Sequence, residues 1–384
     1  MKIVVAPDSF KGNLTAVEVA NHIEAGIRQA DKNIEVVKIP VADGGEGTVE
    51  ALVEATGGEI VKKKVHGPLM TEVDSFFGVL GDGKTAVIEM AACSGITLIP
   101  KEKLNPLLTT TYGVGELITA AKDFGCTKII LGIGGSATND GGMGMAQALG
   151  YRFYDKQNNQ IGQGGKYLCE VAGIDASNYC KEIDAIEIIT ACDVNNPLCG
   201  LNGASYIYGP QKGATPEMIE LLDKGLRNFA DVIKKDLKKD IAEIPGSGAA
   251  GGLGGGIIAF LNSAKLCSGI DMVINTCNFE AAVKDCDLLI TGEGRTDSQT
   301  AHGKAVVGLA KVAKKYNIPV LCLSGSLSEG YDEIYKHGVD AAFSSLIAPM
   351  TLEQALCASP QMLTQAAFAF ARLLIQLQAK SKRL

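Results

Sequence analysis

The 384-residue sequence lacks any stretch of about 18 uncharged apolar residues, the minimum for a helix that crosses a bilayer. Its first residues, MKIVVAPDSFKG, also lack the long apolar core of a signal peptide, because the apolar run ends at Asp8. We therefore expect a cytoplasmic protein that does not use a membrane as its partner.

Clusters of metal-binding and disulfide-forming residues are also missing. The 11 cysteines form no C-x-x-C pair, and the 4 histidines lie far apart in the sequence. We expect reduced, mostly buried thiols rather than a disulfide framework or a zinc site. Basic runs are absent too, since the 36 lysines and arginines are scattered and the net charge is −7. This distribution argues against nucleic acid as the main partner.

Glycine, in contrast, is abundant. The chain has 46 glycines, well above the average usage of about 7%. They gather in loops beside apolar runs, which is where we look for function. The length exceeds that of one ordinary core, so we expect two domains.

Strand-like and helix-like segments alternate at both ends of the chain. Strands are predicted at 2–6, 34–41, 288–291, 320–324 and 341–345, with helices at 15–30, 48–55, 303–316, near 331–337 and at the C-terminus. Thr15 and Glu18 have the spacing of a capping box at the first helix. Such alternation is typical of a parallel, doubly wound sheet.

The middle of the chain has a different pattern. Three β-like runs within 59–90 predict an antiparallel meander, followed by strands at 128–133 and 186–192 and helices at 113–122 and 216–237. We predict an α/β fold with a doubly wound, Rossmann-like parallel sheet built from both chain ends, residues 1–60 and 284–384. Residues 61–283 form an inserted mixed α/β domain, and the active site is expected in the interdomain cleft.

Five loops that follow predicted strands combine glycine with charged or amide side chains. They lie at 8–12, 43–48, 134–142, 193–197 and 292–297. Glycine lets backbone N–H groups approach an anion, and strand-end carboxylates can hold Mg²⁺ or accept a proton. Lysine and arginine neutralise charge on a transferring phosphoryl group. The combination favours phosphoryl transfer.

Each of these signals also has a plain structural interpretation. The loop at 134–142 is either an anion cradle or a tight loop with Asn139 and Asp140 as helix caps. The run at 246–256 is either a second anion loop or close helix packing through small residues. Asp8 and Lys11 can be a cap and a surface lysine, and residues 209–214 can be a turn with a solvated Lys212.

One motif is misleading. Residues 78–85, GVLGDGKT, match the P-loop pattern letter for letter. A P-loop needs a helix that starts at the lysine, whereas Thr85 here begins an alternating, strand-like run. We predict a hairpin turn at 81–83. The fingerprint of a dinucleotide-binding fold is also missing after the first strand.

Taken together, the loops resemble those of the bacterial glycerate kinases that form 2-phosphoglycerate. The resemblance rests on the motifs APDSFKG (6–12), PVADGGEGT (40–48), TTYGVGELI (110–118), GIGGSATNDGG (132–142), CDVNNPLCG (192–200), GPQKGA (209–214), GAAGGLGGG (248–256) and GEGRTDSQ (292–299). They occur in the family's order and extend through nearly the whole chain.

This resemblance implies ATP and Mg²⁺ as cosubstrates and D-glycerate as acceptor, in a two-domain α/β fold unrelated to P-loop kinases. It also favours the 2-hydroxyl, which the residues alone do not distinguish from the 3-hydroxyl. Glycerate 3-kinase activity and a kinase of another small hydroxy acid are the alternatives within this class.

Chemistry then suggests roles for individual residues. We expect Asp193 to act as the general base, with Lys11 and Arg295 stabilising phosphoryl charge or holding the glycerate carboxylate. The other candidates are Asp8, Ser9, Asn195 and Asn196 for substrate, Gly134, Gly135, Ser136, Asn139, Lys212 and Gly292 for nucleotide, and Asp43, Glu46, Glu293 and Asp297 for metal.

Two other classes of function fit the sequence less well. A dehydrogenase acting on a related hydroxy acid fits poorly, because the dinucleotide fingerprint is missing. A non-catalytic protein that binds an organic acid needs cations and amides, but not several carboxylates beside an anionic ligand. The carboxylate-bearing loops therefore favour a metal–nucleotide site.

Overall fold

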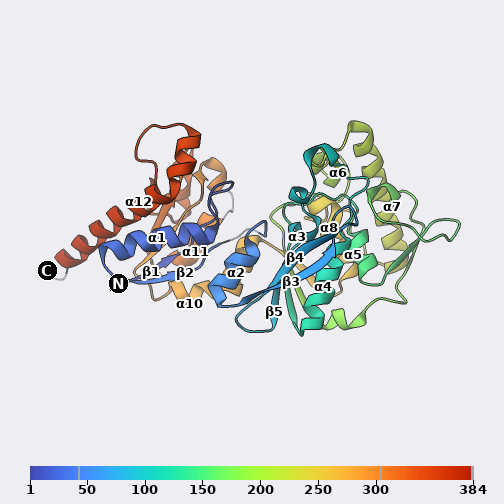
Figure 1. The fold of residues 1–384 in the computed structure, drawn as a ribbon, viewed down its shortest axis with the longest axis horizontal. Coiled ribbons are helices and arrows are strands. Elements are labelled where there is room, and N and C mark those ends of the chain that lie inside the picture. Colours follow the sequence, from blue (N-terminus) through green and yellow to red (C-terminus); the bar gives the residue numbers. More distant parts are fainter. Residues whose placement is uncertain (42–43, 302–304, 382–384) are drawn as a thin grey trace. The chain divides into compact units, whose positions relative to one another are not determined.

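The computed structural model describes residues 1–41, 44–301 and 305–381 (Figure 1). The chain divides into two units. Unit 1 comprises Met1–Ala42, Glu50–Thr56 and Ile270–Leu384, and unit 2 comprises Asp43–Val49 and Gly57–Gly269. The domain boundaries given above, and the expected interdomain cleft, stay predictions.

Unit 1 contains a sheet of five parallel strands in the order β15-β13-β11-β1-β2. The strands are β1 (Lys2–Val5), β2 (Glu35–Lys38), β11 (Leu288–Thr291), β13 (Val320–Ser324) and β15 (Ala341–Ser344). The apolar residues of the three central strands β1, β11 and β13 are buried, as expected for parallel strands covered by helices, whereas the edge strands β2 and β15 are partly exposed. The predicted sheet from both chain ends is confirmed.

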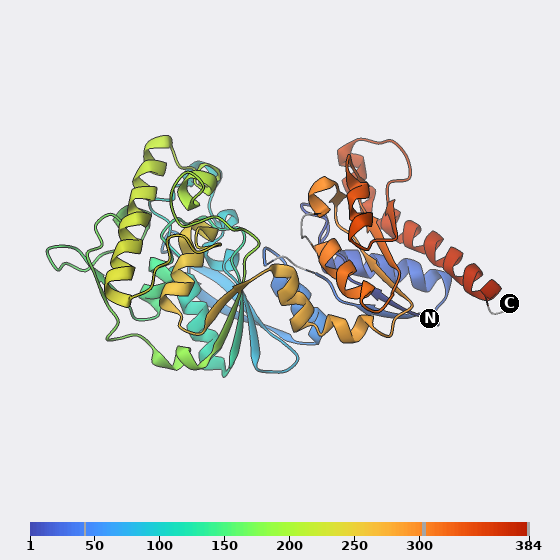
Figure 2. The same cartoon turned by 180° about the vertical axis from the view of Figure 1, so that it is seen from behind.

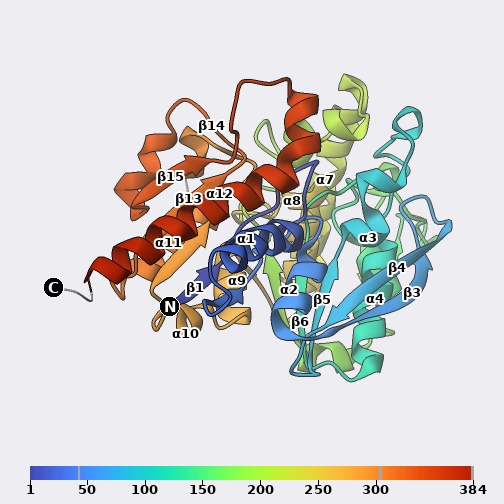
Figure 3. The same ribbon diagram turned by 60° about the vertical axis from the view of Figure 1, so that its left-hand side comes forward.

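Helices cover both faces of this sheet. Helices α1 (Ala16–Ala30) and α12 (Leu352–Ser381) lie side by side on one face, where Ile3, Val5 and Ile290 join their core (Figures 1 and 3). Helix α11 (Ala305–Lys314) packs against β11 and β13. The remaining helices here are α2 (Thr48–Thr56), α9 (Gly269–Thr276) and α10 (Phe279–Val283), with 3-10 turns η6 (Ser298–Ala301) and η7 (Tyr331–His337).

The N-terminus of α1 shows how local sequence sets an element's start. The Thr15 side chain accepts from the Glu18 backbone N–H, and the Glu18 carboxylate accepts from the Thr15 N–H at 2.8 Å. The predicted capping box is confirmed. These two bonds satisfy donors that a helix N-terminus otherwise leaves unpaired.

Unit 2 is built on a mixed sheet of six strands in the order β10-β9-β6-β5-β4-β3. The strands are β3 (Glu59–His66), β4 (Glu72–Val79), β5 (Thr85–Glu89), β6 (Lys128–Gly132), β9 (Glu187–Ala191) and β10 (Ala264–Cys267). The first three form the predicted antiparallel meander, and β5, β6, β9 and β10 are parallel. The carboxyl ends of these four strands therefore meet at one edge.

Helices of varied length surround this sheet, and the longest is α7 (Pro216–Leu237), the yellow-green helix in Figure 2. The others are α3 (Ala91–Ser94), α4 (Tyr112–Phe124), α5 (Met143–Ala148), α6 (Ala204–Tyr208) and α8 (Ala249–Phe260). Five 3-10 turns are also present: η1 (Ile96–Leu98), η2 (Lys101–Lys103), η3 (Gly165–Tyr167), η4 (Lys181–Ala185) and η5 (Pro210–Lys212). Within the described ranges, no helix is both long and apolar enough to cross a bilayer.

Some elements differ from the sequence-based expectation. The short strand β10 and the hairpin of β7 (Arg152–Tyr154) and β8 (Gly173–Asp175) were not predicted. The segment at 331–337 is a 3-10 turn. Helix α8 is interrupted at its start, because Ala250, Gly251 and Gly252 all have positive φ.

Candidate active site

The switch point of the unit 1 sheet lies between β1 and β11. Strand β1 leads to β2 on one side, whereas β11 leads to β13 and β15 on the other. Ligands of doubly wound sheets bind beyond the carboxyl ends of the strands at such a point. Two of the five glycine-containing loops, at 8–12 and 292–297, leave the sheet here.

Backbone hydrogen bonds hold these two loops and the loop after β13 together. The Asp8 N–H donates to the Gly292 carbonyl at 2.8 Å, and the Gly325 N–H donates to the Glu293 carbonyl at 3.0 Å. Arg295 and Thr296 form β12, which pairs in parallel with β14 (Ser326–Leu327). Unit 1 thus brings together seven predicted residues: Asp8, Ser9, Lys11, Gly292, Glu293, Arg295 and Asp297.

The charged side chains in this cluster have defined neighbours. Glu293 Oε1 accepts a hydrogen bond from Thr300 Oγ1 at 2.6 Å. Arg295 Nε lies 3.4 Å from Asp297 Oδ2, although 68% of the arginine side chain is exposed. Because the Arg295 guanidinium is exposed, a small anion can reach it, whereas the Asp297 carboxylate is half-buried. Packing requires a glycine at position 292, because a Cβ there would overlap the carbonyl oxygen of Leu323.

Three of the four predicted metal ligands lie in the described part of the structure. Asp43 lies outside the described residues, and Glu46 is exposed. Glu293 and Asp297 supply the oxygen donors that Mg²⁺ prefers, and Mg²⁺ commonly takes one or two carboxylates plus water and phosphate. Among the residues that the structure describes, no three acidic, histidine or cysteine side chains form a metal-binding group.

In unit 2, predicted residues follow the parallel strands β6 and β9. Asp193 lies just beyond β9, and its Oδ1 accepts a hydrogen bond at 2.8 Å from the N–H of Gly269, just beyond β10. Asp193 and Asn195 are exposed. Asn196 instead holds its own loop, because its amide donates to the Asn202 carbonyl and accepts from the Tyr208 hydroxyl.

The loop at 134–140 leaves β6 at the same edge. A Cβ at Gly134 would lie 2.9 Å from Gly45 Cα, so the glycine permits close approach of the loop at 44–47. Asn139 donates to Ser205 Oγ at 2.8 Å. The fully buried Asp140 accepts from the N–H groups of Gly142 and Gly144 at the start of α5. The capping interpretation therefore holds for Asp140.

Asp140 also binds the segment around Thr111, a contact that the sequence did not predict. Its Oδ2 accepts from the Thr111 N–H at 2.8 Å and from Thr111 Oγ1 at 2.9 Å. Burial raises the pKa of Asp140, and these hydrogen bonds oppose that shift. The TTYGVG motif could not reveal this contact, since nothing in the sequence pairs Thr111 with Asp140.

Lys212 is fully buried at the end of η5, with 1% of its surface exposed. Its Nζ donates to Ser136 Oγ at 2.7 Å and to the Thr138 carbonyl at 2.6 Å. The solvated interpretation of Lys212 is therefore wrong. The lysine and the loop at 134–140 form one structure, which we call the lysine loop (Lys212 with residues 134–140).

The glycines at 246–256 pack against this loop. A Cβ at Gly251 would overlap the Thr138 carbonyl oxygen, and one at Gly256 would overlap the Gly141 carbonyl oxygen. Close backbone packing accounts for these positions. Of the two interpretations given above, the structure favours packing.

A buried carboxylate at the end of β5 was also missed. Glu89 is 4% exposed, and its Oε1 accepts from the Val49 N–H at 2.7 Å near the start of α2. It ends the strand-like run that begins at Thr85, and nothing in the sequence pairs it with Val49. A carboxylate at a helix N-terminus is favourably placed.

The P-loop-like sequence is a hairpin turn, as predicted. Strands β4 and β5 pair in an antiparallel manner around it. Asp82 Oδ1 accepts from the N–H groups of Lys84 and Thr85, and its Oδ2 accepts from Thr85 Oγ1. The lysine therefore precedes a strand rather than a helix, which excludes a phosphate-binding P-loop here.

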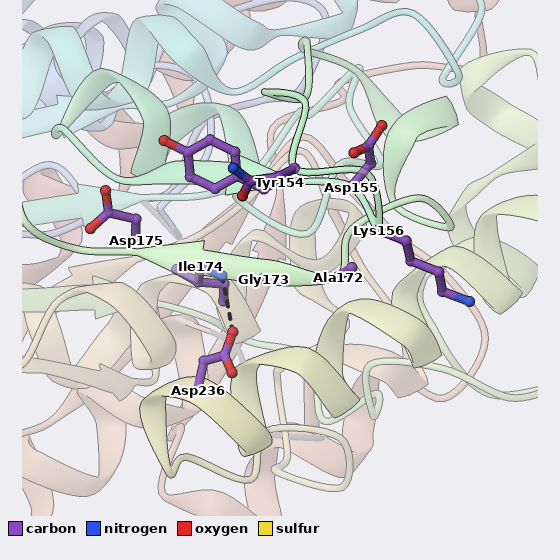
Figure 4. Close-up of a pocket in the computed structure, with 9 residues that line it drawn as sticks. Tyr154, Asp155, Lys156, Ala172, Gly173, Ile174, Asp175 and Asp236 are labelled. Atoms are coloured by element: carbon purple, nitrogen blue, oxygen red, sulfur yellow. Dashed lines mark hydrogen bonds between the residues drawn. The ribbon is translucent and has the colours of Figure 1, made fainter.

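A surface depression of about 540 Å³ lies elsewhere in unit 2, along the β7–β8 hairpin (Figure 4). No predicted site residue lines it. Two of its carboxylates are engaged by nearby backbone: Asp236 accepts from the Ile174 N–H, and Asp155 accepts from the Gln157 N–H. We assign it no role in the site.

Comparisons with known proteins show the family of this chain. Residues 3–375 match the model of the glycerate kinase family. The chain is 52% identical over 355 residues to glycerate 2-kinase of Escherichia coli strain K12, covering 92% of this chain and 93% of that protein. It is also 52% identical over 365 residues to a glycerate kinase of Halalkalibacterium halodurans, covering 95% and 96%.

A solved structure gives the same result for the fold. A crystal structure from Salmonella typhimurium LT2, assigned as glycerate kinase 2, superposes with a TM-score of 0.90 at 50% identity and covers 99% of both chains. This similarity confirms the predicted α/β fold class. By sequence and by structure, the chain belongs to the glycerate kinase family.

Proposed function

We propose that this chain transfers the γ-phosphoryl group of ATP to the 2-hydroxyl of D-glycerate, forming ADP and 2-phospho-D-glycerate. The observation that carries this proposal is the 52% identity to a glycerate 2-kinase over 92% of the chain. The loops at the carboxyl edges of both sheets add the chemistry that such a transfer needs. They supply carboxylates, cations and glycine-rich backbone.

In the proposed reaction, the glycerate hydroxyl oxygen attacks the γ-phosphorus and the bond to the β,γ-bridging oxygen breaks. ADP leaves with that bond's electron pair. Asp193 takes the hydroxyl proton, because an exposed strand-end carboxylate is a suitable general base. Lys11 and the exposed Arg295 neutralise phosphoryl charge, and Arg295 is also suited to bidentate binding of the glycerate carboxylate.

The remaining residues bind the reactants in this proposal. Substrate is held by Asp8, Ser9, Asn195 and Asn196, nucleotide by Gly134, Gly135, Ser136, Asn139, Lys212 and Gly292, and metal by Asp43, Glu46, Glu293 and Asp297. When bound, Mg²⁺ supplies positive charge to the nucleotide phosphates. The 11 cysteines are thiols rather than disulfides in the described structure, which supports a reducing compartment, and we place the enzyme in the cytoplasm.

One reaction tests the proposal. The purified protein is incubated with ATP, Mg²⁺ and D-glycerate, and the phosphorylated position is read by ³¹P–¹H NMR. Phosphate on the 2-oxygen is the expected result. Phosphate on the 3-oxygen overturns the product assignment, and the absence of ADP in folded protein that binds ATP overturns the acceptor.

A further inference from the structure

The lysine loop contains a cation with only uncharged hydrogen-bond acceptors. Lys212 Nζ reaches a hydroxyl, Ser136 Oγ, and a backbone carbonyl, that of Thr138. The side chain is 1% exposed, so water contributes little to its solvation. An ammonium group held in this way is costly unless an anion joins it.

The charged groups around Lys212 do not neutralise it by direct contact. Asp140, on the same loop, is the carboxylate that acts on it electrostatically, and its oxygens are engaged by Thr110, Thr111, Gly142 and Gly144. Burial lowers the pKa of Lys212 to about 7, and Asp140 opposes that shift. The free protein therefore holds a large neutral fraction of this lysine near pH 7.

Titratable groups on neighbouring elements have other partners or face solvent. On α6, Tyr208 donates to Asn196. On α7, Asp223 pairs with Arg227 at 3.0 Å and accepts from the Gly200 N–H. Gly213, the residue after Lys212, packs closely against Leu104, which follows η2. The charged residues of η2 are Lys101, Glu102 and Lys103, and all three are exposed.

The same loop carries polar atoms that lack partners. Thr138 Oγ1 and Asn139 Oδ1 are buried and have no hydrogen-bond partner among the residues that the structure describes. Buried polar atoms are normally paired, and unpaired ones call for a ligand or water. Two such atoms beside the Lys212 acceptors indicate a loop that is completed by a bound polar group.

We propose that Lys212 is the cation that receives the nucleotide phosphates at the lysine loop, and that it takes up a proton from solvent when the nucleotide binds. This proposal rests on the proposed function. The phosphate oxygens replace uncharged acceptors with an anion, which favours the ammonium form. One proton moves from a buffer acid to the lone pair of Nζ, so one N–H bond forms and the bond between that proton and the buffer base breaks.

Linkage fixes the sign of the effect. If binding raises the pKa of Lys212, then nucleotide affinity falls as pH rises between the free and the bound pKa values. Below the free value the lysine is already charged, and affinity is insensitive to this group. The window for measurement therefore opens just above the free pKa of about 7.

The test is calorimetry of MgATP binding without acceptor, at about pH 8 in buffers of different ionisation enthalpy, which gives the number of protons taken up. The full-length wild type is compared with Lys212→Met. Lys239→Met is the matched control, because Lys239 is partly buried and, like Lys212, donates to uncharged acceptors, the backbone carbonyls of Ile258 and Ala259.

We expect uptake of nearly one proton per nucleotide in the wild type and in Lys239→Met, and about none in Lys212→Met. No uptake in wild type that binds MgATP overturns the proposal, and so does equal uptake in Lys212→Met. A folded wild type that binds no MgATP instead overturns the proposed function.

A second measurement covers the case in which Lys212→Met does not fold. The wild type labelled with ¹³C at lysine Cε is titrated by NMR with and without MgATP. We expect one lysine with a midpoint near 7 in the free protein, and a midpoint at least about two units higher with nucleotide. A spectrum in which no lysine shows such a nucleotide-dependent midpoint overturns the proposal.

Discussion

The Asp193 carboxylate accepts a hydrogen bond at 2.8 Å from the backbone N–H of Gly269. Asp193 follows β9 and Gly269 follows β10, so the bond joins the ends of two neighbouring strands. An aspartate and an asparagine both present an oxygen to this N–H, but only the aspartate is a base. The proposed role of Asp193 as a base can therefore be tested separately from its hydrogen bond to Gly269.

We expect Asp193→Asn to lower kcat by about 10²- to 10⁴-fold, because general base catalysis contributes that much. The melting temperature should change little, since the hydrogen bond to Gly269 is kept. Asp193→Ala, the comparison variant, should lose both turnover and some stability. Near-normal kcat in folded Asp193→Asn would show that another group removes the proton.

Two glycines with similar φ angles separate backbone strain from steric overlap. Gly251 has φ +69° and Gly83 has φ +66°, but only at Gly251 would a Cβ meet other atoms, the Thr138 carbonyl among them. Gly83→Ala should cost about 1 kcal/mol of unfolding free energy for its left-handed backbone.

At Gly251, the overlap adds to that cost. We expect Gly251→Ala to lose more than about 3 kcal/mol and to weaken MgATP binding, because Thr138 belongs to the lysine loop. Chemical denaturation and calorimetry measure the two effects. Equal stability losses in the two variants would mean that the backbone near Thr138 shifts at little energetic cost to make room for the Cβ.

The hairpin turn at 81–83 predicts different results for substitutions at Lys84 and Asp82, which are separated by one residue. Lys84 is exposed at a turn, so Lys84→Ala should keep kcat and KM for ATP. Asp82→Ala should lose about 1–2 kcal/mol of stability, because the carboxylate satisfies three donors of Lys84 and Thr85. A collapse of turnover in folded Lys84→Ala would restore the P-loop interpretation.

Buried Lys212 also predicts how stability depends on pH in the absence of nucleotide. Its folded pKa is about 7, below the ordinary lysine value of 10.5, so between these values the unfolded chain binds the extra proton. Raising the pH in that window therefore stabilises the folded wild type relative to Lys212→Met, by up to about 1.4 kcal/mol per pH unit.

Urea denaturation of both proteins between about pH 7 and pH 9 checks this. The stability difference should move by roughly 2 kcal/mol in favour of the wild type as pH rises. A difference that stays constant over this range would show that Lys212 is charged in the folded protein. Asp140 would then be its effective counter-ion.

Strong local signals explain which parts of the fold were predictable. Helix α7 has the predicted bounds, because Thr215 caps its start and Pro216 suits its first turn. Strand β11 also matches, as an apolar run between polar loops. Strand β10 was missed, since four residues, AKLC, carry no period and become a strand only by pairing with β9.

The site was less predictable for a related reason. The sequence predicts which loops carry the chemistry, because glycine and charge recur after strands, and this assignment stays a prediction. It could not show that Lys212 is buried, since that depends on Ser136 and Thr138, more than 70 residues earlier. Nor could it show Glu89 at the start of α2. Long-range contacts, rather than local propensity, decide such roles.

The parallel sheet of unit 1 has a consequence for how the chain folds. Strand β1 is synthesised long before its neighbour β11, which begins at Leu288, so the two strands can pair only after almost 300 further residues have been made. Residues 57–269 of unit 2 are contiguous and contain all six strands of their sheet. Contacts between distant residues form slowly. We therefore expect unit 2 to fold on the ribosome before β1 can pair with β11.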